Sequence, residues 1–105
     1  SGGESKRIEI ATVLARKDAK LLVFDEPEAG IDLWSFTSLI DAFEKIKQDS
    51  TRSLLIISHQ ERIMNIADHI AVVADGKVTK TGTRDEVFPS LIDKTSATRC
   101  SLRNN

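Results

Sequence analysis

The sequence predicts an α/β fold, with a mainly parallel sheet, flanking helices and one antiparallel hairpin. Two short apolar runs, Leu21–Phe24 and Leu54–Ile57, indicate strands buried on both faces, as in parallel sheets. Segments with helical spacing of apolar residues precede both runs, so helices and strands alternate along the chain. Asp75-Gly76, between two further strand-like segments, is a strong signal for a two-residue hairpin turn.

The composition is typical of a soluble globular protein. The chain has 105 residues, 40% hydrophobic and 30% charged, with a formal net charge of −1. This balance provides no positive field for nucleic acid or an anionic membrane, so we expect neither as a partner. The apolar runs are too short to span a bilayer, so no membrane insertion is expected. With no signal peptide and a single cysteine, Cys100, we expect a cytoplasmic location.

The first expected helix begins at the start of the chain. Ser1 and Glu4 have the spacing of a capping box. Apolar residues then recur at helical intervals from Ile8 to Ala15, which predicts a helix to about Lys17.

The second expected helix follows the strand Leu21–Phe24. That strand ends at Asp25-Glu26-Pro27, and Gly30 marks a loop. Asp32 is a suitable N-cap residue for the helix. An apolar stripe at helical spacing predicts that the helix buries one face. The segment Lys45–Arg52 is polar and turn-like. The stripe consists of Phe36, Leu39, Ile40, Phe43 and Ile46.

The strand Leu54–Ile57 ends at Ser58-His59 and introduces the second half of the chain. A short helix is expected around Arg62–Ala67, followed by a strand over His69–Ala74. Lys77–Thr81 should pair antiparallel with that strand across the Asp75-Gly76 turn.

A last helix is expected after the hairpin. Thr83 and Glu86 repeat the capping-box spacing, and Pro89 should limit the helix. Residues 93–105 are Ser, Thr, Lys, Arg and Asn for the most part, which predicts a disordered tail.

Chemically useful side chains gather where the two parallel strands end, which is where α/β sheets bind ligands. Asp25 and Glu26 follow the first strand, and two adjacent carboxylates there are costly unless something pairs with them. Mg²⁺ would satisfy one, and the other could polarise a water that attacks a phosphate. His59 could donate to a phosphate oxygen. The alternatives are a solvated acidic turn and a histidine that only enters a helix.

The segment Ser1-Gly2-Gly3-Glu4 is a second candidate site. Glycines in a first helical turn cost roughly 1 kcal/mol each relative to alanine. They also let an anion approach the free backbone N–H groups. The alternatives are a simple capping box and residual linker sequence.

These motifs together resemble the nucleotide-binding domain of ABC-type ATPases, which are P-loop NTPases, over residues 1 to 90. Ser1–Glu4 resembles the signature motif, and Leu21–Glu26 resembles the Walker B strand with its acidic pair. Glu28–Asp32 resembles the D-loop, Ser58-His59 the switch histidine, and Val72–Gly82 the hairpin that follows. Their order and spacing agree with the family.

The resemblance implies ATP hydrolysis, with ATP and Mg²⁺ as cofactors in the intact parent protein. Asp25 would hold Mg²⁺ through water, Glu26 would activate the attacking water, and His59 would contact the γ-phosphate. Asp32 would act across the interface with a second ABC ATPase subunit. Nucleotide held by that subunit would be bound by Ser1, Gly2, Gly3 and Glu4.

A narrower resemblance is to the SufC-type ATPase of iron–sulfur cluster assembly. Glu4 replaces the commoner Gln, Glu9 places an acid on the signature helix, and Glu28–Asp32 departs from the usual Ser-Ala-Leu-Asp. These features imply a scaffold protein as partner. The alternatives are the ATP-binding subunit of an ABC transporter, with a membrane subunit as partner, and a catalytically inactive interaction module.

One departure from the family concerns the phosphate-binding loop. No Gly-x-x-x-x-Gly-Lys-Ser/Thr occurs in these 105 residues, nor does the glutamine loop of the family. Residues 1–92 are therefore expected to be a partial ABC ATPase domain, its C-terminal part, that is inactive alone. It would be a piece of a longer gene product, a truncated form or a split protein.

Overall fold

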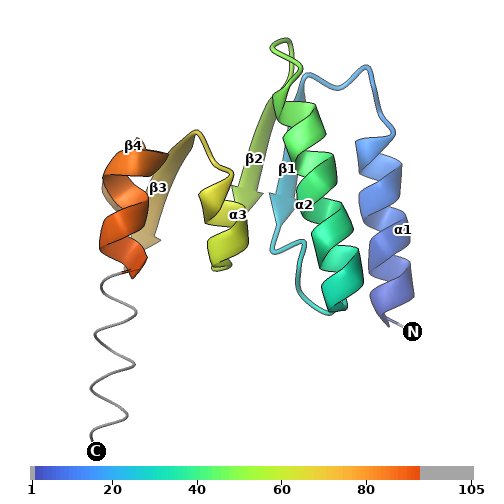
Figure 1. Ribbon diagram of the computed structural model, residues 1–105, viewed down its shortest axis with the longest axis horizontal. Coiled ribbons are helices and arrows are strands. Elements are labelled where there is room, and N and C mark those ends of the chain that lie inside the picture. The colour runs from blue at the N-terminus through green and yellow to red at the C-terminus, as the bar shows by residue number, and fades with distance from the viewer. Residues whose placement is uncertain (1, 93–105) are drawn as a thin grey trace, which may run out of the picture. The chain divides into compact units, whose positions relative to one another are not determined.

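The computed structural model describes residues 2–92, with side chains from residue 5 onward. Ser1 and the expected tail over 93–105 lie outside the described residues. The chain forms two compact units, and the boundary between them lies between His59 and Gln60. Each unit contains its own two-stranded sheet (Figure 1). None of the helices within residues 2–92 has the length and hydropathy needed to cross a membrane.

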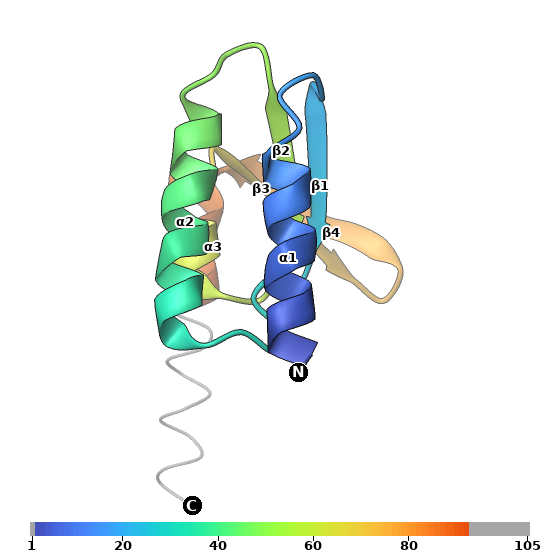
Figure 2. The ribbon, with the colours of Figure 1, turned by 90° about the vertical axis from the view of Figure 1, so that its right-hand side faces the viewer.

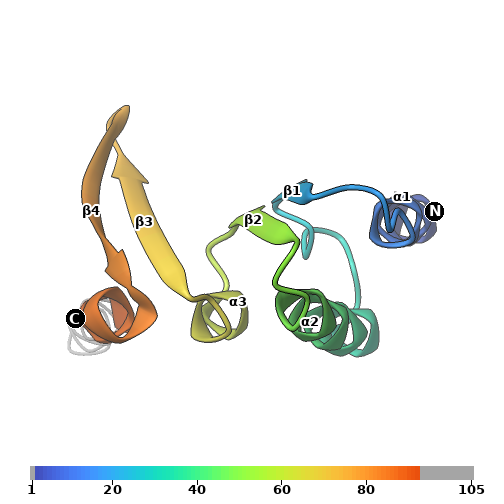
Figure 3. The same ribbon diagram turned by 90° about the horizontal axis from the view of Figure 1, so that it is seen from above.

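The first unit contains two helices and a parallel sheet. In chain order it consists of α1 (Gly2–Leu14), β1 (Leu21–Asp25), α2 (Leu33–Lys47) and β2 (Ser53–Ile57). β1 and β2 pair in parallel, which confirms the expected neighbours. Seen from above, α2 lies on one side of this sheet (Figure 3), and α1 runs alongside α2 (Figure 2).

The core of the first unit lies between α2 and the inner face of the sheet. Leu22 and Phe24 of β1 are buried there, and the Phe24 and Phe43 rings meet at 5.1 Å between centroids. Phe43 has no exposed surface. The stripe predicted from the sequence is confirmed, since all of its members on α2 are buried: Phe36, Leu39, Ile40, Phe43 and Ile46.

The expectation that both strands are buried on both faces is wrong for this chain. Leu21 and Val23 of β1 are 60% and 51% exposed, and Leu55 and Ile57 of β2 are 54% and 51% exposed. These four residues form what we call the outer face of the β1–β2 sheet. Burial alternates because α2 covers one face, whereas no described element covers the other.

Helix ends differ slightly from the predicted positions. α1 ends at Leu14 rather than near Lys17, because Arg16 N–H bonds to the carbonyl of Val13 and tightens the last turn. α2 continues to Lys47, into the segment expected to be a turn.

The second unit contains α3 (Glu61–Asn65), β3 (His69–Ala74), β4 (Lys77–Thr83) and a helix over residues 84–92. β3 and β4 form an antiparallel hairpin, as predicted. Asp75 and Gly76 have φ of 52° and 75°, and two successive positive φ angles characterise the tight hairpin turn that Asp-Gly favours.

The predicted capping box at the last helix is confirmed. Glu86 N–H donates to Thr83 Oγ1 at 3.3 Å, and Thr83 N–H donates to Glu86 Oε1, also at 3.3 Å. Two amides that the helix itself leaves unpaired are satisfied in this way.

The expectation that Pro89 limits this helix is wrong, because residues 84–92 are helical. Pro89 removes the hydrogen bond to the carbonyl of Asp85. Val87 and Phe88, directly before it, are buried, and their packing keeps the chain helical past the proline.

Candidate functional site

The candidate site lies where β1 and β2 end in the first unit. Asp25, the last residue of β1, is the register partner of Ile57, the last residue of β2. Glu26 N–H donates to the carbonyl of Ile57 at 2.7 Å, so the pairing continues one residue beyond the strand. The parallel arrangement thus brings Asp25-Glu26 and Ser58-His59 to the same edge of the sheet.

Glu26 and His59 are in contact at this edge. Glu26 Oε1 lies 3.6 Å from His59 Nε2, and the two side chains are 50% and 89% exposed. A protonated imidazole would form an ion pair here. Both groups are open to solvent and therefore accessible to a ligand.

The backbone of Glu26 is held in an unusual conformation. Its φ is 47°, a left-handed value that side chains with a Cβ seldom adopt. The carbonyl of Glu26 accepts hydrogen bonds from Ala29 N–H at 3.1 Å and from Lys6 Nζ at 2.7 Å. Pro27, the next residue, is fully buried. The turn after β1 is thus anchored on both sides, and α1 is attached to it through Lys6.

Glu28 also belongs to this site, although the sequence did not indicate a contact for it. The Ser58 hydroxyl donates to the Glu28 carboxylate, at 2.8 Å from Oε1 and 3.1 Å from Oε2. The sequence singled out Glu28 only because the segment Glu28–Asp32 departs from the usual pattern of the family. Glu28 joins the loop after β1 to the residue before His59.

Asp32 caps α2, which is one of the roles the sequence suggested for it. Its Oδ1 accepts from Ser35 N–H at 2.7 Å, and its Oδ2 accepts from the Ser35 hydroxyl at 3.3 Å. The backbone hydrogen bond, helped by the hydroxyl and the charge of Arg7, holds the pKa of Asp32 below its usual value. Its action across a subunit interface stays a prediction.

Gly2, Gly3 and Glu4 lie in the first turn of α1, where a helix start was expected. Their side chains and Ser1 lie outside what is described. The anion-binding role of this segment stays a prediction.

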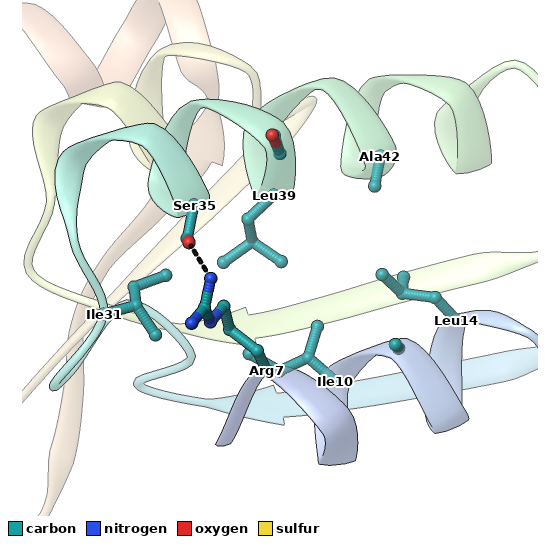
Figure 4. Close-up of a pocket in the computed structure, with 9 residues that line it drawn as sticks. Arg7, Ile10, Leu14, Ile31, Ser35, Leu39 and Ala42 are labelled. Carbon is teal, nitrogen blue, oxygen red and sulfur yellow. Dashed lines mark hydrogen bonds between the residues drawn. The ribbon is translucent and has the colours of Figure 1, made fainter. Parts of the chain in front are cut away.

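A groove of about 320 Å³ lies between α1 and α2 (Figure 4). At one end Arg7 Nη1 donates to the Ser35 hydroxyl at 3.2 Å, so these polar groups satisfy each other. Most of the remaining lining is apolar, and Asp25, Glu26 and His59 are not part of it. The groove is therefore separate from the strand-end site.

Within residues 5–92, no group of three or more His, Cys, Asp or Glu side chains is arranged to hold a metal ion. A cation at the strand ends would therefore need ligands besides these side chains, such as water or phosphate oxygens.

Curated proteins with similar sequences include ATP-binding proteins of transporters. An uncharacterised ABC transporter ATP-binding protein of Methanocaldococcus jannaschii is 40% identical over 87 residues, which is 83% of this chain and 34% of the relative. The energy-coupling factor transporter ATP-binding protein EcfA2 of Latilactobacillus sakei is 36% identical over 89 residues, 84% of this chain and 30% of the relative. The chain thus spans about a third of the length of these relatives. No family model matches it.

Solved structures show the same fold. A dimeric ATP-binding cassette in a post-hydrolysis state, bound to ADP and Pi, matches 80% of this chain and 36% of its own with a TM-score of 0.71 and 20% identity. The CbiO1 protein of Clostridium perfringens, part of an ABC transporter complex, matches 94% of this chain and 40% of its own with a TM-score of 0.68 and 27% identity. The predicted α/β fold class, part of an ABC ATPase domain, is confirmed.

Proposed function

We propose that this chain, which corresponds in sequence and fold to part of an ABC-type ATP-binding domain, supplies half of the hydrolytic machinery of a transporter ATPase. The observation that carries the proposal is the contact of 3.6 Å between Glu26 Oε1 and His59 Nε2 at the ends of adjacent parallel strands. The two carboxylates of Asp25 and Glu26 and the imidazole of His59 lie at one edge of the sheet, and such groups are suited to phosphoryl transfer.

The roles follow from the position of each group. Asp25 is an exposed carboxylate at the strand end, suited to binding Mg²⁺ through water. The metal ion would neutralise charge on the phosphates of ATP. Glu26 takes a proton from the water whose oxygen attacks the γ-phosphorus, and ADP leaves. His59, largely exposed, donates a hydrogen bond to a γ-phosphate oxygen.

In this proposal, ATP hydrolysis needs a phosphate-binding loop and a second ATPase subunit in addition to the residues of this chain. The sequence contains no phosphate-binding loop, so in this proposal the β- and γ-phosphates are cradled by residues outside this chain. Ser1, Gly2, Gly3 and Glu4 would bind the nucleotide of a second ATPase subunit. Asp32 would act across the interface with that subunit.

The transporter assignment replaces iron–sulfur cluster assembly as the leading proposal. The names of the relatives support the transporter alternative that the sequence left open. In this proposal the partner is a membrane component, and the protein works on the cytoplasmic side of the membrane.

The SufC-type assignment remains a second candidate because of particular residues. Glu4, Glu9 on α1 and the segment Glu28–Asp32 depart from the common family pattern. Affinity purification of the native protein separates the candidates. A membrane component as the stoichiometric partner supports the transporter, and a soluble scaffold supports cluster assembly.

The test of hydrolysis is Glu26→Gln in the protein at its full native length. The amide keeps the shape but loses the base, so we expect turnover to fall by about 100-fold or more while ATP binding persists. Glu44→Gln on the exposed face of α2 is the matched control and should leave turnover unchanged. A Glu26→Gln protein that hydrolyses ATP nearly as fast as the unaltered protein would contradict the role. An unaltered protein that binds partners but never hydrolyses ATP would indicate an inactive interaction module.

A further inference from the structure

Three links join the turn after β1 to the end of β2 in the first unit. The first is the backbone hydrogen bond from Glu26 N–H to the carbonyl of Ile57, at 2.7 Å. The second is the contact of 3.6 Å between Glu26 Oε1 and His59 Nε2. The third joins Ser58 Oγ to both carboxylate oxygens of Glu28. The proposed chemistry gives no role to Glu28 or Ser58, the two side chains of the third link.

The third link lies where it can affect the geometry of the other two. Ser58 lies between Ile57, which ends β2, and His59, whose largely exposed side chain contacts Glu26. Ser58 itself is half-buried, so its hydrogen bond is less open to exchange with water than one on the surface. Fixing the Ser58 side chain fixes the backbone from which the His59 side chain departs.

The chemistry of Glu28 suits such a link. A carboxylate accepting from a hydroxyl forms a charge-assisted hydrogen bond, which is stronger than a bond between neutral groups. The loop that carries Glu28 is itself held, because Pro27 is fully buried and Ile31 N–H donates to the Glu28 carbonyl at 3.3 Å. A residue with no side-chain acceptor at position 28 would leave the Ser58 hydroxyl without this bond.

We propose that Glu28 is a positioning residue that, through Ser58, sets the placement of His59 beside Glu26. The inference rests on the proposed function, and it gives a role to a residue at which the loop departs from the family pattern. Glu28 touches neither substrate nor the reacting atoms in this scheme. Its effect passes entirely through the Ser58 hydroxyl, and this makes the proposal testable by a double-mutant cycle.

The experiment compares Glu28→Ala, Ser58→Ala and the double variant in the protein at its full native length. We expect each single change to lower kcat about tenfold, with KM for ATP changed less than about twofold. The double variant should be no slower than either single variant, because both remove one link. Ser58→Thr keeps the hydroxyl and should restore most of the activity. Glu44→Ala on α2 is the matched carboxylate control, expected to leave kcat unchanged.

A readout other than activity separates this inference from the proposed function. The ring resonances of His59, assigned in NMR spectra by comparison with His59→Gln, should shift in Glu28→Ala and in Ser58→Ala but not in Glu44→Ala. If the unaltered protein hydrolyses no ATP, the proposed function fails, and these resonances still decide whether Glu28 positions His59.

Three results would overturn the positioning role. One is kcat for Glu28→Ala within twofold of the unaltered protein. Another is a double variant whose loss is the product of the two single losses, since independent residues behave in that way. The third is an unshifted His59 resonance in Glu28→Ala, measured after thermal unfolding has shown that the variant is folded.

Discussion

At the scale of single residues, several carboxylates act as local caps in the described structure. Asp32 accepts from Ser35 at the start of α2, and Asp49 and Glu86 accept from the hydroxyl and N–H groups of Thr51 and Thr83. These hydrogen bonds hold the pKa of all three carboxyl groups below its usual value. Each bond favours the charged form, so these hydrogen bonds are strongest while the carboxyl groups are ionised.

The Asp32 cap predicts a pH dependence of stability for the first unit. A pKa that is lower in the folded state gives stability that is fully present above the unfolded value, near pH 4, and is lost as pH falls toward the folded value. Asp32→Asn keeps a capping side chain without a titrating charge. We expect the melting temperature of the variant at pH 7 to be close to that of the unaltered chain, and its fall between pH 7 and 3 to be smaller. Asp41→Asn on α2 is the control, and equal falls in all three proteins would contradict the prediction.

The candidate site could be predicted from the sequence only in part. Asp25, Glu26 and His59 were expected at one sheet edge and lie there, because parallel pairing brings the two strand ends together. Their roles stay predictions. The bond between Glu28 and Ser58 was not predicted, since it joins side chains thirty residues apart. The left-handed backbone of Glu26 was also missed, because nothing in its residue type requires it.

At the scale of elements, α2 holds the first unit together. Its apolar stripe faces β1 and β2, and Phe43 is completely buried against Phe24. By contrast, Trp34 in its first turn is 86% exposed. Phe43 and Trp34 therefore differ in what their removal should cost.

Phe43→Ala should abolish the fold of the first unit. Truncating a buried phenylalanine costs about 3–5 kcal/mol, which is comparable to the whole stability of a small domain. We expect circular dichroism to show loss of much of the helical signal in Phe43→Ala at 25 °C. Trp34→Ala removes an aromatic side chain from the surface of the same helix, and it should retain the signal. A cooperative transition for Phe43→Ala close to that of the unaltered chain would contradict this account of the core.

Elements with a local signal were predicted well. The Asp75-Gly76 turn, the cap of Thr83 by Glu86 and the stripe on α2 each depend on residues close in the sequence. The burial of the two parallel strands was predicted wrongly, because an apolar run shows only that the side chains of a strand can be buried. Whether both faces are covered depends on other elements. Pro89 was misjudged for a related reason, since burial of its neighbours outweighed a local preference.

At the scale of the whole molecule, each unit has a two-stranded sheet within residues 2–92. Such a sheet leaves an unpaired edge on each strand, and exposed edges invite pairing with another chain. The outer face of the β1–β2 sheet adds four apolar side chains that are more than half exposed. Apolar surface in contact with water favours association, and a small unit has little stability with which to resist it.

We therefore expect this chain of 105 residues to self-associate at tens of micromolar, through the outer face of the β1–β2 sheet. Val23→Lys with Leu55→Lys places two charges on that face, at register partners that already meet solvent, and should shift the chain toward the monomer without loss of secondary structure. Ile8→Lys, at a more exposed apolar position on α1, is the control and should leave association unchanged. Sedimentation velocity, run together with circular dichroism, measures both properties. If the unaltered chain is a monomer with one sharp, reversible thermal transition, the first unit is stable with its outer face exposed to water, and the prediction is wrong. If Ile8→Lys reduces self-association as much as the two substitutions in the sheet, the contact does not lie on the outer face.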